Sequence, residues 1–194
     1  MADISTRIGM PLDRFIEEMK DQPFEIINRE KRMKPSKPFG EDTLIRLLFL
    51  VLETHIQKQN TGLVYSKTPF ILTDEDEPDW VTGARIPDVM YYVRDRMASY
   101  ETQTPNHHAR PLALAPDLVI EVVSATDGTS ELDERIEAFL LDGVRLVWIL
   151  NPVGRIASVH APDVEQPTHL KEDGVLDGGD VIPGFKIALA KLFE

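Results

Sequence analysis

The stretch Asp117-Leu118-Val119-Ile120-Glu121-Val122-Val123 decides the fold, because it is an apolar, largely β-branched run with one carboxylate inside it. Pro116 precedes this run and the turn-forming segment 124–128 follows it, so the sequence predicts a short buried strand. Desolvation of an ionised carboxylate costs on the order of several kcal/mol unless a partner compensates it. We therefore expect a cation or a metal ion against Glu121.

This strand begins the best-defined unit of the sequence, which runs from Asp117 to Pro152. Ser130, with an acidic residue three positions later, predicts the start of a helix, and Asp142-Gly143 predicts its end. The apolar run Val144 to Leu150 predicts a second buried strand. A strand, a helix and a strand with short joins predict two parallel strands linked by a right-handed crossover.

The remaining sequence is predicted to add helices and short strands. Apolar residues at steps of three and four predict a long helix from Glu41 to Gln59 and a shorter one from Pro11 to Met19. Short strands are predicted at 24–28, 63–65, 69–73, 85–93, 156–160 and 184–189. With 194 residues and no repeat or linker, the sequence predicts one mixed α/β domain over residues 1–194.

Composition limits the cellular setting. The chain is 42% hydrophobic and 28% charged, as is usual for a globular protein in water. It has no cysteine, which excludes disulfides and thiolate metal sites and fits a reducing cytoplasm. Residues 1–7 lack the apolar core of a signal peptide, and the apolar run 47–52 is too short to span a membrane. We therefore predict a cytoplasmic protein without a membrane segment.

The net charge of −12, from 33 acidic and 21 basic side chains, argues against a broad nucleic-acid-binding surface. It does not exclude a nuclease, because only the surface beside the site must attract phosphate. Basic residues gather between Arg29 and Lys37. This segment is predicted to be a solvated hairpin or loop, with a phosphate-contacting edge as the alternative.

Three polar residues interrupt the apolar framework: Asp88, Glu121 and Arg135. Two carboxylates on neighbouring strands can bind one Mg²⁺ or Mn²⁺, with the backbone carbonyl of Val122 and water as further ligands. Such an ion lowers the pKa of a bound water and neutralises charge that develops on a phosphate. The structural alternatives are that Asp88 bonds its own turn after a proline and that Glu121 belongs to a buried ion pair.

Arg135 falls on the helix that follows the Glu121 strand, at the flank of its apolar stripe. Its long side chain can extend back toward the end of the strand, where a cation would stabilise a phosphate transition state. The alternative is a surface pair with Glu131 or Asp142. Asp117 shares a face of the strand with Glu121 but sits at the strand's beginning, so we assign it a structural or supporting role.

The sequence resembles the Uma-two family, a set of restriction-endonuclease-like proteins placed in the PD-(D/E)XK nuclease superfamily. The matching segments are 24–27, Arg85-Ile86-Pro87-Asp88-Val89, 116–124, 143–152 and 182–187. The resemblance implies a restriction-endonuclease-like mixed β-sheet flanked by helices. It further implies Asp88 as the aspartate of the Pro-Asp motif, Glu121 as the acidic residue of the third motif, Mg²⁺ or Mn²⁺ as cofactor, and DNA as substrate.

The chain departs from the pattern of this family at its basic position. The superfamily usually has lysine two residues after the glutamate, where this chain has Val123. The resemblance implies that the lysine of this family stands on the next helix, at the position that Arg135 holds here. Arginine supplies charge but does not readily release a proton. The family also carries a histidine at the start of the long helix, where this chain has Phe39-Gly40-Glu41, and Glu41 is a further candidate acidic ligand.

Two functions of different kinds therefore stay open. The first is a metal-dependent endonuclease that hydrolyses DNA phosphodiester bonds, with Asp88, Glu121 and Arg135 as its catalytic residues. The second is a catalytically impaired nuclease-like module that binds nucleic acid or a protein partner, or that serves as a homodimer. Hydrolysis of another phosphate ester is a third possibility, because the sequence shows no element that would read bases. The sequence contains no phosphate-binding loop or serine-nucleophile motif.

Overall fold

In a computed structural model the chain is described over residues 9–34, 36–123 and 128–194. Residues 1–7, which the sequence predicts not to be a signal peptide, and the predicted loop 124–127 lie outside these ranges. The contacts between residues divide the chain into two compact units, each built from separate segments. Unit 1 comprises the segment up to 35, then 69–86 and 106–115, and unit 2 comprises 36–68, 87–105 and 116–194.

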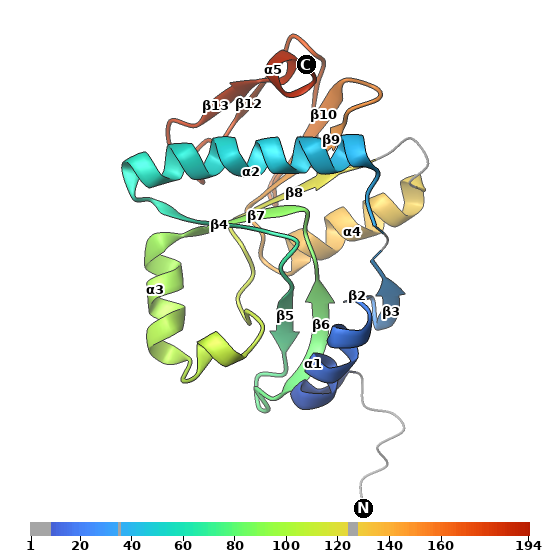
Figure 1. The fold of residues 1–194 in the computed structure, drawn as a ribbon, viewed down its shortest axis with the longest axis vertical. Helices are drawn as coiled ribbons and strands as arrows, with labels where there is room; N and C mark the ends of the chain where they lie inside the picture. The colour runs from blue at the N-terminus through green and yellow to red at the C-terminus, as the bar shows by residue number, and fades with distance from the viewer. Residues whose placement is uncertain (1–8, 35, 124–127) are drawn as a thin grey trace, which may run out of the picture. The chain divides into compact units, whose positions relative to one another are not determined.

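Unit 2 is built on a six-stranded mixed sheet with the order β11-β10-β9-β8-β7-β4 (Figure 1). Only β8 and β9 run parallel, as the sequence predicted for the strands on either side of a helix, while the other neighbours in this sheet are antiparallel. The strands are β4 (Gly62–Ser66), β7 (Val89–Val93), β8 (Leu118–Val122), β9 (Leu146–Asn151), β10 (Ile156–His160) and β11 (Thr168–Leu170). A separate antiparallel pair consists of β12 (Val175–Asp177) and β13 (Lys186–Ala188).

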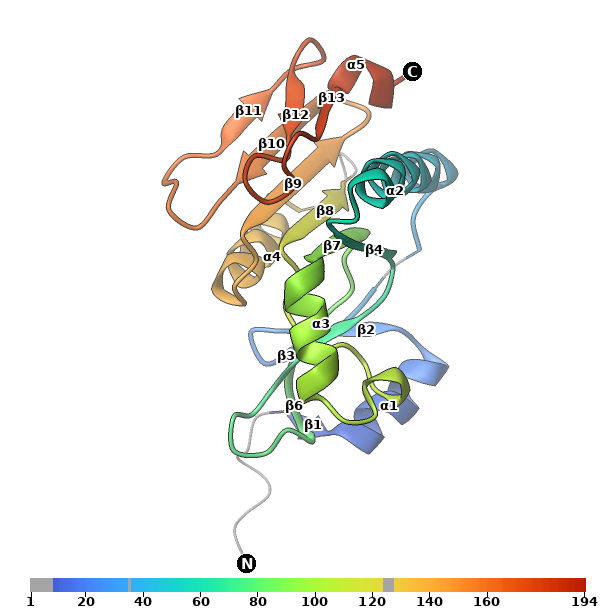
Figure 2. The ribbon, with the colours of Figure 1, turned by 90° about the vertical axis from the view of Figure 1, so that its left-hand side faces the viewer.

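Helices lie on both faces of this sheet. Figure 2 shows α2 on one side of β8 and β9 and α4 on the other. The helices of unit 2 are α2 (Phe39–Gln59), α3 (Arg94–Gln103), α4 (Thr129–Leu141) and α5 (Leu189–Leu192). Asn60 ends α2 in the left-handed conformation, and Gly143, with φ of +95°, allows the chain to turn sharply after α4. Among the described helices, none is long and apolar enough to cross a membrane.

The alternation of side chains along β8 places Glu121 away from the main core. Leu118, Ile120 and Val122 join the core that α2 covers, where Trp148 is also fully buried. Because successive side chains of a strand point to opposite faces, Glu121 faces the side of the sheet on which α4 lies. The position of Glu121 in the strand thus determines that its carboxylate faces α4 and not α2.

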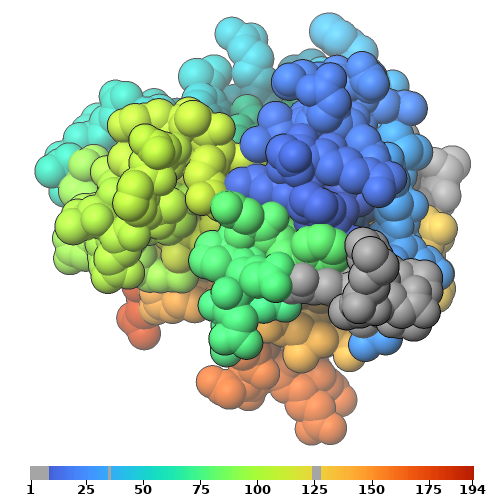
Figure 3. Space-filling model, turned by 90° about the horizontal axis from the view of Figure 1, so that it is seen from below, coloured from blue at the N-terminus to red at the C-terminus, as the bar shows by residue number. Residues whose placement is uncertain are grey.

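Unit 1 contains a five-stranded sheet with the order β1-β6-β2-β3, in which β5 also pairs with β6. The strands are β1 (Met10–Pro11), β2 (Phe24–Ile27), β3 (Glu30–Met33), β5 (Phe70–Thr73) and β6 (Trp80–Arg85). Helix α1 (Leu12–Asp21) packs on this sheet through Phe15, whose ring meets Phe24 edge-on at 5.3 Å between centroids. A short 3₁₀ turn, η2 (His107–Ala109), belongs to the same unit. In Figure 3, α1 and the turn between β5 and β6 are exposed on the face shown.

The predicted mixed α/β fold, with sheets flanked by helices, is confirmed. The prediction of one strand over 85–93 is wrong in one respect. The segment belongs to two strands, β6 and β7, which lie in different units. Pro87 lies between them and has no amide hydrogen to continue a ladder. Asp88 therefore sits immediately before β7 rather than within a strand. Two further differences concern helices. The sequence predicts a connection with one helical turn near residues 94–97, whereas α3 is a helix of ten residues, and α4 follows Gly128 without the predicted Ser130 cap.

The packing of α2 makes a matched stability test possible, because Leu52 is fully buried and Leu50 is 45% exposed on the same helix. Leu52→Ala should lower the free energy of unfolding by about 2–5 kcal/mol, since it leaves a cavity in the core. Leu50→Ala should change it by no more than about 0.5 kcal/mol. Urea denaturation followed by circular dichroism measures both, and equal losses would contradict this assignment of the core.

Candidate active site

Asp88 and Glu121 occupy neighbouring positions at the ends of two paired strands. The antiparallel register of β7 and β8 joins Val89 to Ile120, so its continuation by one residue places Asp88 opposite Glu121. Asp88 Oδ2 accepts a hydrogen bond from the amide of Val122 at 2.8 Å. Both carboxylates are almost completely buried. The two predicted acidic residues are therefore brought to the same end of the β7–β8 pair.

Arg135 provides a cation for Glu121 from helix α4. Its Nη2 donates to Glu121 Oε1 at 2.7 Å, and its side chain is largely buried. The sequence left open whether Arg135 reaches back to the strand or stays in a surface pair, and the structure shows the first arrangement. A buried pair of this kind satisfies both charges, whereas removal of one partner leaves the other charge desolvated.

Lys37 is a second cation at the site, and the sequence did not single it out. It lies just before α2, and its Nζ donates to the carbonyl of Val122 at 2.5 Å. The same ammonium is 3.5 Å from Asp88 Oδ2 and 3.8 Å from Glu41 Oε2. Lys37 belongs to the basic segment that was predicted to be solvated, yet its side chain is only 13% exposed. The one local signal was the spacing of four residues between Lys37 and Glu41.

Glu41 brings a third carboxylate to this group from the first turn of α2, where it is buried. Negative charge is favourable there, because the first turn of a helix carries free amide groups and the positive end of the helix dipole. The position is the one suggested by the resemblance for an acidic ligand from the first helix. Its contact in the structure is with Lys37, so a role as a metal ligand stays a prediction.

Asp117 holds a different place, at the opposite end of β8. It is fully buried, its Oδ2 accepts from the amide of Val93 at 2.9 Å, and its Oδ1 lies 2.8 Å from Arg96 and 3.3 Å from Arg145. These contacts connect the end of β7, α3 and the segment before β9 to the start of β8. They are the contacts of a structural residue, as the sequence indicated.

Val123, which stands where the superfamily usually has lysine, is a buried apolar residue. Its amide donates to the carbonyl of Leu150 at 2.8 Å and continues the pairing of β8 with β9. No cation can come from this position. The positive charges that meet the carboxylates come instead from α4, through Arg135, and from the segment before α2, through Lys37.

The donor atoms suit a hard divalent cation, because the carboxylates of Asp88 and Glu121 and the carbonyl of Val122 are all oxygen ligands of the kind that Mg²⁺ and Mn²⁺ prefer. Within the described ranges, no group of three or more His, Cys, Asp or Glu side chains is arranged to hold a metal ion. Any such ion would therefore depend on the Val122 carbonyl and on water as well as on the two carboxylates. In this structure the same oxygens contact Lys37 and Arg135.

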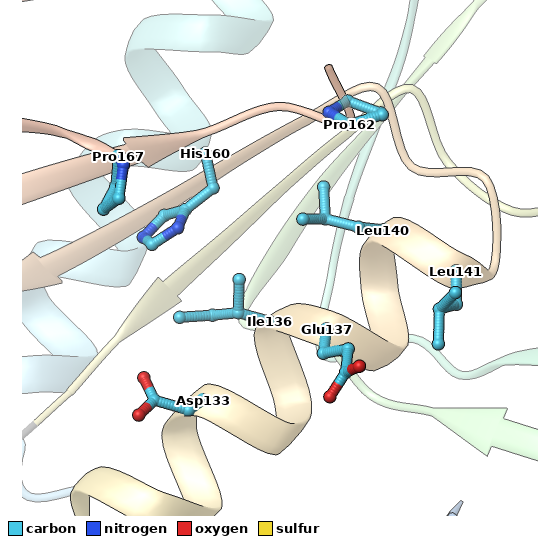
Figure 4. Close-up of a pocket in the computed structure, with 8 residues that line it drawn as sticks. All are labelled: Asp133, Ile136, Glu137, Leu140, Leu141, His160, Pro162 and Pro167. Atoms are coloured by element: carbon cyan, nitrogen blue, oxygen red, sulfur yellow. The ribbon is translucent and has the colours of Figure 1, made fainter. Parts of the chain in front are cut away.

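A separate shallow depression lies between α4 and the segment around β10 and β11. Its lining is largely apolar, and burial together with His169 lowers the pKa of His160 below its usual value. None of the candidate catalytic residues lines it, so we assign it no part in the site. The residues around it are Asp133, Ile136, Glu137, Leu140, Leu141, His160, Pro162 and Pro167 (Figure 4).

A helix-flanked mixed sheet, with an aspartate and a glutamate at the ends of adjacent strands, is the arrangement that the sequence resemblance implied. The structure is similar to the crystal structure of a putative nuclease belonging to DUF820 from Anabaena variabilis ATCC 29413, with a TM-score of 0.75. The match covers 95% of this chain and 97% of that one at 16% sequence identity, which shows a shared fold.

The family model Uma2, described as "Putative restriction endonuclease", matches residues 12–190. The chain belongs to this family, as the sequence comparison of its motifs predicted. A comparison with curated proteins gave no match.

The contacts of Asp117 separate its role from that of the candidate ligands. Asp117→Asn should lower the free energy of unfolding by about 1.5–3 kcal/mol, because it weakens hydrogen bonds to charged partners. The affinity for Mn²⁺ should stay unchanged in this variant. Chemical denaturation and isothermal titration calorimetry measure the two quantities, and a folded variant that no longer bound Mn²⁺ would contradict a purely structural role.

Proposed function

We propose that this protein is a metal-dependent endonuclease that hydrolyses phosphodiester bonds in DNA. The observation that carries the proposal is the placement of Asp88 opposite Glu121, with the guanidinium of Arg135 held against Glu121. Membership in a family described as restriction endonucleases supports the same reaction. Asp88, Glu121 and the Val122 carbonyl would hold Mg²⁺ or Mn²⁺, which would supply an activated water and neutralise charge on the phosphate.

Each protein group then has a defined task. The amide of Val122 fixes the orientation of Asp88, and Glu121 fixes that of Arg135. A guanidinium held in this way can stabilise the negative charge that develops on the phosphate oxygens without reorganising during the reaction. A guanidinium does not readily release a proton, so we assign Arg135 charge stabilisation and not proton removal.

The approach of DNA depends on local charge, because the chain as a whole is strongly acidic. The basic hairpin β2–β3 is a weak candidate for a phosphate-contacting edge, since acidic neighbours already compensate two of its cations. Lys31 pairs with Glu18 at 2.7 Å, and Arg32 pairs with Glu30 at 3.1 Å. These pairs favour the prediction of a solvated hairpin. We place the phosphate contact at Arg135 instead.

The second candidate function is a nuclease-like binding module without catalytic activity. Two observations favour it: Val123 is buried where a catalytic lysine is usual, and the ammonium of Lys37 contacts the oxygens proposed for the metal. A cytoplasmic location and a homodimer stay predictions from the sequence under either function.

A plasmid-nicking assay in Mn²⁺ tests the nuclease function. The wild type should convert supercoiled DNA to the nicked form, and Asp88→Asn and Glu121→Gln should each reduce the rate by at least about 100-fold. The control is Glu137→Gln, an exposed carboxylate on α4 that should leave the rate unchanged. No nicking by the wild type, or equal nicking by wild type and Asp88→Asn, would favour the binding module.

Substitutions of Arg135 test its task at the site. Arg135→Lys keeps the charge and can also release a proton, so the nicking rate should equal or exceed that of the wild type. Arg135→Gln removes the charge and should lower the rate by about 100-fold. Single-turnover nicking at saturating Mn²⁺ compares the two variants. Wild-type activity in Arg135→Gln would show that the guanidinium does not contribute to the reaction.

A further inference from the structure

The ammonium group of Lys37 lies against oxygens that the proposed metal ion would use. It donates to the Val122 carbonyl at 2.5 Å and is 3.5 Å from Asp88 Oδ2. A third oxygen, Glu41 Oε2, is 3.8 Å away. An ammonium has three donors and no acceptor, so a group of carboxylate and carbonyl oxygens suits it, as the same group suits a metal ion.

The Lys37 ammonium and a divalent cation would compete for the Val122 carbonyl and Asp88 Oδ2, because each brings positive charge to the same atoms. Mg²⁺ binds oxygen at about 2.0–2.1 Å and demands a near-octahedral arrangement of its ligands. An ion bound to the Val122 carbonyl and to Asp88 would therefore stand where the Lys37 ammonium stands. Two positive charges at such a short separation also repel each other strongly when their side chains are buried.

The position of Lys37 allows its side chain to leave without disturbing the fold. Lys37 precedes Pro38, the residue that caps α2, so it belongs to the connection and not to the helix. Its charge is carried on a flexible four-carbon stem. The side chain is largely but not completely buried, so part of it already contacts solvent.

We propose that Lys37 is a tethered cation that occupies the divalent-ion position, so that metal binding exchanges the Lys37 ammonium for the ion. This inference rests on the proposed metal site and adds its regulation. In the absence of metal, Lys37 supplies positive charge to the buried carboxylates of Asp88 and Glu41. Its displacement weakens the apparent affinity for metal, because the ion must compete with a charge that is permanently attached to the protein.

Isothermal titration of the full chain with MnCl₂ tests the exchange. Lys37→Met keeps much of the apolar stem and removes the charge, and it should lower the Kd for Mn²⁺ by at least about tenfold, since a competing and repelling cation is gone. Without metal this variant should have a lower Tm than the wild type, and Mn²⁺ should raise its Tm by more. Lys37→Gln, whose amide can still donate to the Val122 carbonyl, should show the same tighter binding and guards against misfolding of the first variant.

Lys67→Met is the matched control for a general effect of charge. Lys67 pairs with Asp42, next to Glu41 in the first turn of α2, and its side chain is about half exposed. Its removal changes the net charge by the same amount but should leave the Kd for Mn²⁺ within about twofold of the wild type, because an exposed charge is screened. Equal tightening in Lys67→Met and Lys37→Met would overturn the exchange.

The binding and nicking experiments together distinguish a failure of the exchange from a failure of the nuclease function. Tighter Mn²⁺ binding by Lys37→Met without nicking by any variant would support the exchange and contradict the nuclease. Nicking by the wild type, together with unchanged or weaker Mn²⁺ binding in both folded Lys37 variants, would support the nuclease and overturn the exchange. Absence of Mn²⁺ binding in the wild type and in both variants would overturn both.

Discussion

The hydrogen bond from the amide of Val122 to the carboxylate of Asp88 is the interaction on which the candidate site depends. It joins the last residue of β8 to the residue before β7, where Pro87 interrupts the backbone pairing. The bond fixes Asp88 opposite Glu121, and the Val122 carbonyl of the same residue accepts from Lys37. One peptide segment therefore orients the aspartate through its amide and receives the lysine through its carbonyl.

Buried carboxylates also attach the helices of unit 2 to its sheet. Glu121 connects β8 to α4 through Arg135, and Asp117 connects the start of β8 to α3 through Arg96. Asp88 connects the other end of β7 to the segment before α2 through Lys37. A charge is costly to bury alone, so each of these pairs favours one placement of its helix over others that would bury the same apolar area. The same residues thus favour one arrangement of the helices and supply the charges of the site.

The sequence predicted those features that local pattern controls. The β-branched run around Glu121 and the parallel β8–β9 pair follow from spacing within a single strand–helix–strand unit. The same spacing put Arg135 within reach of the strand but left a surface pair open, and the structure shows the contact with Glu121. Lys37 was missed because two of its partners, Asp88 and the Val122 carbonyl, are distant in sequence, and because its neighbours in the chain have the composition of a solvated basic segment. The full length of α3 was missed because only Met97 and Tyr100 are buried along it, which leaves a weak apolar period. Pro87 signalled that the segment 85–93 divides into two strands, because proline cannot donate a hydrogen bond to the ladder. The prediction of one strand gave this signal too little weight.

The two cation contacts of the site differ greatly in the length of chain that they close. Arg135 and Glu121 are 14 residues apart, whereas Lys37 and the carbonyl of Val122 are 85 residues apart. A contact across a long loop carries a larger entropy cost of closure. Glu121 and Arg135 need only β8 and α4 to meet. The oxygens beside Lys37 come from β8, from the residue before β7 and from α2, so the ion-binding half of the site depends on the placement of all three elements.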